Sequence, residues 1–449
     1  MGKLGGMKLR ALAPFVAFAA VAAVAWYSEV VVRPVVTPGP VQVTYWEKWT
    51  AFEGDAMRAV VDAFNRSQTG IHVNLLTISG IQDKTLFAVA GGNPPDVAGL
   101  YGPNVAQYAD DEAILPLDDY CRRYGIEGSQ YLRPFWDAGV YQGHVYALPS
   151  APATTALHLD RRMLQEAGLD PDRAPQTIEE LDQWAERIVR RNGAGKIVKA
   201  GFMPAEPGWW NWSWGAYFGG RLWDGGTRIT ASSPENERAM AWIAGYSRRY
   251  GVTELNTFRS GFGSFSSPQN AFLAGQVAME LQGVWMHNFI TMYSPGLPWF
   301  AAPFPHPADR PDLAEMTVAD EDVLVIPRGA KHPDAAFQFI AFVQSQKGME
   351  LLCMGQRKFT PLAKVSDEFW RTHPNPYIKL FARLAQGKNV VAAPQIGIWP
   401  EYQAELGNAF DQVSLLAKTP KEALAAVQAR MQPKLDEYLR IKALRGKLR

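Results

Sequence analysis

The chain has 449 residues, which is long enough for two domains of ordinary size, each with its own hydrophobic core. Hydrophobic residues make up 47% of the sequence and charged residues 20%, a composition typical of a globular protein rather than a disordered one. The 45 lysines and arginines nearly balance the 44 aspartates and glutamates. This absence of excess positive charge argues against nucleic acid as the main partner.

The N-terminus has the pattern of an export signal. Three basic residues precede an apolar run over residues 11–27, and this charge asymmetry predicts that the N-terminus stays in the cytoplasm. Two alternatives remain open: cleavage after Ala25, or an uncleaved anchor of about 20 residues that spans the bilayer. Residues 1–32 are therefore expected to be a signal peptide or a transmembrane anchor. Either alternative places the remaining chain in the periplasm or on the extracytoplasmic face of the inner membrane.

The first folded segment is predicted to be a βαβ unit. A proline-rich stretch over 33–40 indicates a short stiff linker. Alternating apolar residues then predict strands over 41–46 and 71–75, and apolar residues at helical spacing predict a helix between them. Strand, helix and strand in this order indicate a parallel pair of strands.

Later helices are predicted from their capping residues. Thr177 and Glu180 form a capping box, and Ser233 and Thr419 each precede a proline at the first helical position. The C-terminal part of the chain is expected to be mostly helical. The whole pattern predicts an α/β protein with mixed strands and many helices.

The sequence contains no recognisable catalytic or metal-binding constellation. It lacks the His-Glu-x-x-His, phosphate-loop and Gly-x-Ser-x-Gly motifs, and its seven histidines are scattered singly. The acidic clusters 110–112 and 320–322 lack the alternating ligand spacing of a calcium loop. No catalytic residue, metal or cofactor is therefore predicted. Cys121 and Cys353 are far apart in sequence, and the sequence leaves open whether they are bonded.

A dense cluster of tryptophans is the strongest candidate for a binding surface. Four of the fifteen tryptophans lie in the six residues from Trp209 to Trp214. Neighbouring side chains cannot all point into one core, so at least one indole is expected to face a cavity, as carbohydrate receptors require. Trp209 and Trp212 are predicted to do so, while Trp210 and Trp214 are the alternative pair for core packing.

Twelve short segments carry a family resemblance, and they follow one another in the order that the family has. They are Thr44–Trp46, Gly70–Val73, Pro94–Val97, Ile114–Asp118, Val145–Pro149, Ala156–Asp160, Ala167–Leu169, Pro175–Thr177, Phe272–Met279, Gly283–Trp285, Ala335–Ile340 and Thr360–Pro361. Together they resemble the family 1 extracellular solute-binding proteins of ABC importers, the group that contains the maltose-binding protein. The resemblance covers roughly residues 41 to 440.

The resemblance implies a periplasmic binding protein fold of two α/β lobes joined by crossing strands, with the ligand between them. The first lobe would hold residues 41–151 plus 317–360, and the second 152–316 plus 361–449. A monomeric receptor would bind a small carbohydrate without transforming it and deliver it to an ABC permease by hinge closure. The sequence departs from the family in having no cysteine for lipid attachment after the signal.

The remaining candidate ligand-binding residues come from strand ends and from the resemblance. Glu47 and Trp49 follow the first strand, where open α/β sheets bind ligands. Positions that match the family add Tyr101, Asn104, Trp285, Trp399 and Tyr402. Thr154, Thr155, Glu321 and Asp322 are added because they lie near the proposed crossings between the lobes. Three alternatives stay open: another polar solute such as a glycerol phosphodiester, an anchored sensor, or an exported carbohydrate-active enzyme, which would need two carboxylates about 5–10 Å apart.

Overall fold

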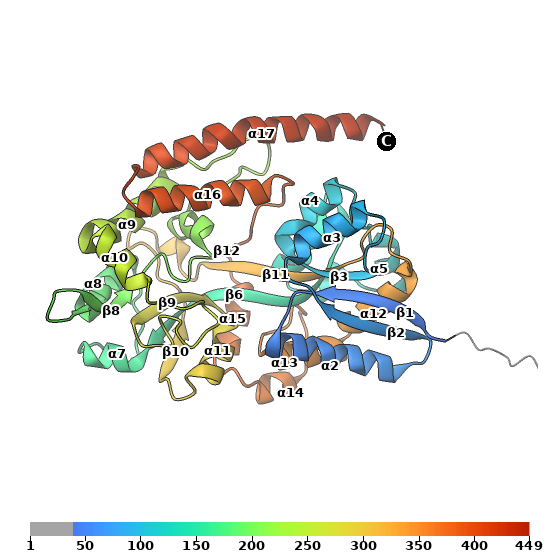
Figure 1. Cartoon of the computed structure of the whole chain (residues 1–449), viewed down its shortest axis with the longest axis horizontal. Helices are drawn as coiled ribbons and strands as arrows, with labels where there is room; N and C mark the ends of the chain where they lie inside the picture. Colours follow the sequence, from blue (N-terminus) through green and yellow to red (C-terminus); the bar gives the residue numbers. More distant parts are fainter. Residues whose placement is uncertain (1–38, 449) are drawn as a thin grey trace, which may run out of the picture.

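The computed structural model describes residues 39–448, in which strands and helices alternate along the chain (Figure 1). The predicted signal or anchor (1–32) and most of the predicted linker (33–40) lie outside these residues. The strands are β1 (Val41–Glu47), β2 (Ile71–Thr77), β3 (Val97–Tyr101), β4 (Val140–Tyr141), β5 (His144–Val145), β6 (Leu148–Asp160), β7 (Arg190–Arg191), β8 (Ile197–Phe202), β9 (Val277–Gly283), β10 (Trp299–Ala302), β11 (Thr317–Val325) and β12 (Val390–Val391). Within residues 39–448, no helix combines the length and the hydropathy needed to cross a membrane.

Most of the helices lie on either side of these strands. The α-helices are α2 (Ala51–Ser67), α3 (Ile81–Ala90), α4 (Val105–Asp110), α5 (Asp118–Tyr124), α6 (Arg133–Ala138), α7 (Arg161–Glu166), α8 (Ile178–Ile188), α9 (Pro234–Tyr250), α10 (Val252–Arg259), α11 (Met286–Tyr293), α12 (Pro333–Gln344), α13 (Gln346–Gln356), α14 (Asp367–Thr372), α15 (Ile378–Ala385), α16 (Trp399–Ser414) and α17 (Pro420–Leu448). The 3-10 helices are η1 (Gly102–Asn104), η2 (Gly128–Gln130), η3 (Asn211–Phe218) and η4 (Pro311–Leu313).

The predicted βαβ unit is confirmed. β1 and β2 pair in parallel from Val41–Ile71 to Glu47–Thr77, and α2 connects them. The helix buries one apolar face, which includes Met57, Val60, Val61 and Phe64. In Figure 1, β1 runs from the outer edge toward the centre of the molecule, and α2 runs from the centre back toward that edge. The end of β1 and the start of α2 therefore lie close to the middle of the fold.

One mixed sheet of ten strands runs through the molecule. Its main order is β2-β1-β3-β11-β6-β9-β8-β7, with β10 beside β6 and β12 beside β11. β6 is 13 residues long; its first half pairs with β11 and its second half with β9 and β10. β6 and β11 thus connect the two halves of the sheet, as Figure 1 shows.

Two hydrophobic cores lie on either side of this connection. One core is built mainly from β1, β2, α2, α12 and α13, and it includes Tyr45, Phe64 and Phe339. The other is built mainly from the second half of β6 with β9, α8, α9, η3, α16 and α17, and it includes Trp214 and Phe304. Helices of the C-terminal part thus complete the second core, in keeping with the predicted helical content.

The predicted helix caps are present. The backbone N–H groups of Asn236 and Glu422 donate to the hydroxyls of Ser233 and Thr419. Thr177 caps α8, but the Glu180 carboxylate accepts from the backbone of Gln176 rather than from Thr177. This capping box is therefore only half formed.

The two cysteines are buried and unbonded. Cys121 lies in α5 and Cys353 in α13, and both thiols are free. Burial raises the pKa of Cys121 to about 12, so this thiol stays protonated at neutral pH. The sequence left a disulfide between these residues open, and the structure excludes it.

Where β11 separates from β6, hydrogen bonds from threonine hydroxyls to the backbone replace the backbone–backbone hydrogen bonds between the two strands. The Thr317 hydroxyl accepts from the N–H of Thr155 at 3.0 Å and donates to its carbonyl at 2.9 Å. The Thr155 hydroxyl accepts from the N–H of Val318 and contacts the hydroxyl of Tyr217 at 2.9 Å. Because all of these groups are buried, the hydroxyls are needed to satisfy the backbone.

We expect Thr317→Val to lower the free energy of unfolding by about 1–3 kcal/mol, because the buried N–H and carbonyl of Thr155 lose their partner while the shape is kept. Urea denaturation followed by tryptophan fluorescence measures this change. Thr257→Val, at an exposed position of α10, is the control and should leave the midpoint almost unchanged. Equal stability of both variants would show that the Thr155–Thr317 pair contributes nothing.

Candidate functional site

A cavity of about 610 Å³ lies in the middle of the fold. Its walls come from the end of β1, the start of α2, β11, the segment around η3, and helices α11 and α16. The lining residues are Lys48, Trp49, Thr50, Ala51, Phe52, Glu53, Tyr101, Pro103, Trp209, Trp210, Trp212, Phe265, Ser266, Trp285, Phe289, Met292, Tyr293, Ala319, Asp320, Asp322, Lys358, Ala393, Trp399 and Gln403. Small-molecule sites commonly measure about 300–1,000 Å³, so this volume suits a ligand of that class.

The tryptophan cluster forms one wall of this cavity. Trp209 and Trp210 contact Trp285, with ring centroids 5.5 and 5.9 Å apart. Trp212 meets Trp399 almost at a right angle, with centroids 5.2 Å apart. Five indoles from three different segments thus stand side by side along the cavity.

The local conformation explains which tryptophans reach the cavity. Trp212 lies in the 3-10 helix η3, and Trp209 and Trp210 directly precede it. Only Trp212 of these three belongs to the 3-10 helix, so the turn before the helix places Trp209 and Trp210. Trp214 is buried among Phe202, Tyr217 and other aromatic residues of the core. Trp209 and Trp212 line the cavity as expected, and Trp210 lines it too.

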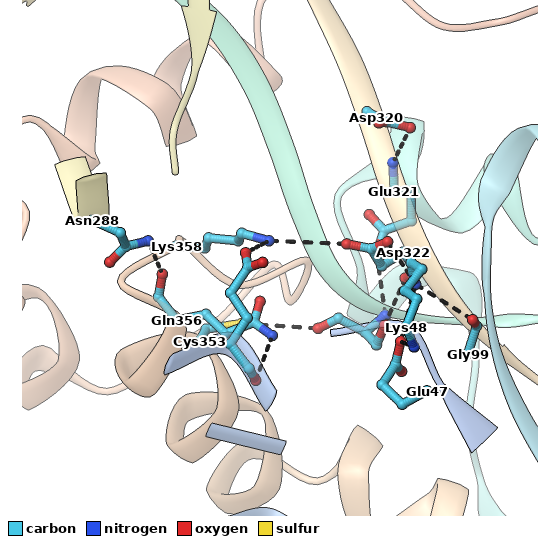
Figure 2. Close-up of polar contacts among 12 residues, drawn as sticks. Glu47, Lys48, Gly99, Asn288, Asp320, Glu321, Asp322, Cys353, Gln356 and Lys358 are labelled. Carbon is cyan, nitrogen blue, oxygen red and sulfur yellow. Dashed lines mark hydrogen bonds and ion pairs between the residues drawn. The ribbon is translucent and has the colours of Figure 1, made fainter. Parts of the chain in front are cut away.

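A chain of ion pairs lies at a second side of the cavity, and Figure 2 shows contacts of this chain. The Lys48 ammonium lies 2.9 Å from Asp322 and 3.2 Å from Glu47. The Lys358 ammonium lies 2.9 Å from Glu53 and 3.9 Å from the other oxygen of Asp322. Asp322 therefore links the two lysines. We refer to Glu47, Lys48, Asp322, Lys358 and Glu53 as the ion-pair chain.

The two lysines are held in their charged form by this chain. Burial lowers the pKa of Lys358, but the negative charges of Glu53 and then Asp322 outweigh it and raise the pKa. Burial likewise acts on Lys48, and Asp322 and Glu47 raise its pKa above the ordinary value. Lys48 also lies over the rings of Trp49 and Tyr101, 4.9 and 4.6 Å from their centroids. Both lysines are therefore occupied by protein partners.

The three consecutive acids of β11 have different environments because side chains alternate along a strand. Asp320 and Asp322 line the cavity, whereas Glu321 points the other way and accepts from the buried N–H of Ser150. Burial, together with the charge of Asp322, raises the pKa of Asp320 from 3.8 to about 6. Burial and the charges of Asp322 and Asp320 also raise the pKa of Glu321 well above its usual range.

Asp320 keeps acceptor capacity for a ligand. The only hydrogen bond that its carboxylate receives from the described residues comes from the N–H of Glu321 to one oxygen, at 2.9 Å. A carboxylate can accept several hydrogen bonds. Asp320 is therefore the acid of the cavity best suited to accept from a bound molecule.

Seven of the thirteen residues predicted from the sequence line the cavity: Trp49, Tyr101, Trp209, Trp212, Trp285, Asp322 and Trp399. The other six do not line it: Glu47, Asn104, Thr154, Thr155, Glu321 and Tyr402. Glu47 acts behind the wall, since its carboxylate pairs with Lys48 and lies against Gly99, where a Cβ atom would overlap it. Asn104 is half-buried in η1, beside the lining residue Pro103.

Thr154, Thr155 and Tyr402, like Glu321, form hydrogen bonds with residues that are far away in the sequence. Thr154 donates its hydroxyl hydrogen bond to the carbonyl of Phe381. Thr155 belongs to the threonine cluster between β6 and β11. Tyr402 is buried in α16 and donates to the carbonyl of Leu222. Each of these side chains supports the walls instead of facing the ligand space.

Sequence reasoning missed several residues of the cavity. Lys48, Glu53, Asp320 and Lys358 are four of its five charged lining residues, and Phe265 and Phe289 are aromatic lining residues. The alternation of the acidic triplet on its strand was a usable signal for Asp320, because it predicts that positions 320 and 322 share a face. A single lysine such as Lys358 carries no such signal, since most lysines lie on the surface.

No cluster of three or more histidine, cysteine or acidic residues suited to a metal ion occurs in the described part of the chain. The ion-pair chain accounts for most of the acids at the cavity. Asp320 is the remaining acid among the lining residues.

The fold and this cavity define a solute receptor, and comparison with known proteins identifies its family. A profile of the bacterial extracellular solute-binding proteins matches residues 52–350. The chain therefore belongs to the bacterial extracellular solute-binding protein family 1, as the sequence predicted. Its members are extracellular or periplasmic receptors that do not act as enzymes.

Individual relatives bind different solutes. The chain is similar to CpMnBP1 with mannotriose bound, with 27% identity and a TM-score of 0.76 over 87% of this chain and 99% of that one. It has the fold of UgpB from Mycobacterium tuberculosis in complex with glycerophosphocholine, with 21% identity and a TM-score of 0.71 over 89% of this chain and all (100%) of that one. The sn-glycerol-3-phosphate-binding periplasmic protein UgpB of Pectobacterium atrosepticum is 22% identical over 37% of this chain, and the match spans 38% of that relative.

The raised pKa of Asp320 predicts a pH-dependent stability. Between about pH 4 and pH 6 the native carboxyl keeps a proton that the unfolded chain has lost, so stability falls as the pH rises through this window. The variant Asp320→Asn should not show this fall in stability, because an asparagine side chain does not titrate. Its stability advantage over the wild type is expected to grow from about pH 4 to about pH 7, measured by urea denaturation at several pH values. If the difference in free energy of unfolding between Asp320→Asn and the wild type does not change with pH, the pKa of Asp320 is not raised in the folded protein.

Proposed function

We propose that the protein is the substrate-binding component of an ABC importer and that its ligand is a saccharide. The observation that carries this proposal is the number of indoles at the cavity: six tryptophans line it, namely Trp49, Trp209, Trp210, Trp212, Trp285 and Trp399. Sugar rings present flat C–H faces that stack on aromatic rings. Few other polar solutes offer such faces.

Polar groups at the cavity complement the hydroxyl edges of a sugar. Asp320 supplies acceptor oxygens, Tyr101 a hydroxyl and Gln403 an amide. In a site with such groups, a ligand that lacks a matching hydroxyl leaves them unpaired, which is how receptors and enzymes reject close analogues. The cavity therefore combines stacking surface with directional polar contacts, as saccharide recognition requires.

The charge of the cavity favours a saccharide over a phosphate ester. Two lysines and three acids line it, which gives a net charge of −1 when all are ionised, and no arginine is among the lining residues. Both lysines already pair with acids of the ion-pair chain. A phosphate would have to displace these partners and leave acids unpaired, which is costly at a buried site. This argues against the glycerol phosphates that some relatives bind.

The proposed mechanism is hinge closure without a chemical step. The lobes would be residues 41–151 plus 317–360 and 152–316 plus 361–449, with β6 and β11 as the crossing strands. Ligand that touches both lobes favours the closed form through its differential contacts. The closed monomer then docks on an ABC permease, which receives the ligand.

The N-terminal segment sets the place of action in this proposal. As a cleaved signal, residues 1–32 leave a free periplasmic receptor. As a retained anchor, they hold the receptor on the extracytoplasmic face of the inner membrane, and the linker over 33–40 raises its effective concentration at the permease.

The proposal predicts that Trp209→Ala weakens saccharide binding by about tenfold to a hundredfold, because a half-buried aromatic wall of the cavity is lost. Isothermal titration of the purified protein with mannose and glucose oligosaccharides measures the change. Trp370→Ala, which removes a half-buried indole of α14 away from the cavity, is the matched control and should retain full affinity.

Thermal-shift screening compares saccharides with phosphate esters as candidate ligands. Saccharides should raise the melting temperature of the wild type, because a ligand that binds only the native state stabilises it. Glycerol 3-phosphate and glycerophosphocholine should not. Stabilisation by these phosphates with no response to any saccharide would refute the choice of ligand, and release of a product from a bound saccharide would refute the absence of catalysis.

A further inference from the structure

Polarity is segregated around the cavity in a way that a plain saccharide does not require. The charged lining residues come from the end of β1, the start of α2, β11 and the segment after α13. An apolar set faces them: Phe289 and Met292 from α11, Phe265 from the segment before β9, and Phe52 from the start of α2 beside the charged Glu53. We call these four residues the apolar rim.

The apolar rim is a continuous surface. The ring of Phe289 contacts Phe265 and Phe52, with centroids 5.4 and 6.1 Å apart. Phe265 in turn meets Trp209 of the tryptophan wall at 3.8 Å between centroids. The rim is therefore joined directly to the proposed stacking surface, and a ligand that rests on Trp209 extends onto it.

Part of this surface is open to solvent. Met292 is 46% exposed and the adjacent Tyr293 36% exposed, and both line the cavity. Exposed apolar side chains are ordinary when they are isolated, but these two adjoin a phenylalanine cluster at a binding cavity. A grouped apolar surface beside a binding cavity can contact an apolar group of the ligand.

Hydrogen-bonding groups are sparse at the apolar rim. Phenylalanine and methionine side chains offer no strong donor or acceptor, and Thr50, Glu53, Ser266 and Tyr293 are the polar lining residues nearest to the rim in sequence. A buried hydroxyl without a partner costs free energy, whereas a buried methylene gains about 0.8 kcal/mol. At the buried part of the rim, a hydrocarbon group therefore gains more free energy than a group that carries hydroxyls.

From this arrangement we infer that the ligand is a saccharide carrying an apolar substituent, an alkyl or aryl glycoside, whose hydrocarbon lies against Phe52, Phe265, Phe289 and Met292. This inference rests on the proposed function, since the sugar head group occupies the tryptophan wall and the polar groups around Asp320. It narrows the ligand class from sugars in general to amphipathic glycosides.

A series of methyl, butyl and hexyl glycosides of one disaccharide tests the inference by isothermal titration below the micelle concentration. Affinity should rise with chain length by about fourfold for each methylene that becomes buried. The measured quantity is the ratio of the hexyl to the methyl affinity, so that a change in head-group binding cancels.

Variants of single residues test whether the alkyl chain of the glycoside binds at the apolar rim. Met292→Ser changes an exposed side chain of the rim and should lower the hexyl-to-methyl ratio by about fivefold or more, and Phe52→Ala should lower it as well. Phe87→Ser is the matched control, because Phe87 lies on α3, is 74% exposed and does not line the cavity. Its ratio should equal that of the wild type, which separates specific binding from adsorption of a detergent-like ligand.

The outcomes distinguish a failure of the inference about the apolar substituent from a failure of the proposed saccharide receptor. Equal affinity for the methyl and hexyl glycosides overturns the inference and leaves the saccharide receptor standing. A chain-length effect that Phe87→Ser reduces and Met292→Ser does not also overturns it. Failure of every glycoside to bind the wild type overturns the proposed function together with the inference.

Discussion

The ion-pair chain is the interaction on which the site depends. Lys48 and Lys358 are both buried, and a buried ammonium group is tolerated only when acids and hydrogen-bond acceptors surround it. Asp322 meets this requirement for both lysines at once, because β11 carries it into the centre of the fold between the end of β1 and the segment after α13 (Figure 2). The same contacts that position these segments form the polar wall of the cavity.

The aromatic and charged walls are physically one unit. Lys48 and Lys358 lie 4.9 and 5.7 Å from the ring centroid of Trp49, and Lys358 lies 5.8 Å from that of Trp285. Cation–π contacts of this kind stabilise both the indole orientation and the buried charge. The lysines are therefore structural parts of the wall, and Asp320 is left as the carboxylate with acceptor capacity for a ligand.

Local patterns predicted the fold better than the site. The alternation in β1 and β2 and the apolar face of α2 are local, so the βαβ unit was predictable, and the density of Trp209 to Trp214 indicated a cavity wall. Thr154 was assigned to the ligand space from its place near the proposed crossing and Tyr402 from the family resemblance. Their actual partners lie 227 and 180 residues away in sequence, where no local pattern indicates them. Lys358 was missed for the same reason, since its acids belong to α2 and β11. Which polar side chain faces a cavity and which one satisfies a buried carbonyl is decided by tertiary pairing.

Contacts between the proposed lobes also bear on how a ligand would control the proposed hinge. The side chain of Asn288 in α11 donates to the carbonyl of Gln356 in α13 at 2.9 Å, and Phe52 of α2 contacts Phe289 of α11. Under the proposed lobe assignment, these contacts join the two lobes directly and must break when the lobes separate. A ligand that covers the apolar rim adds buried surface to the same junction, so its hydrocarbon strengthens the closed form. Burial of the same apolar surface would then account both for specificity toward the apolar substituent and for stabilisation of the closed form.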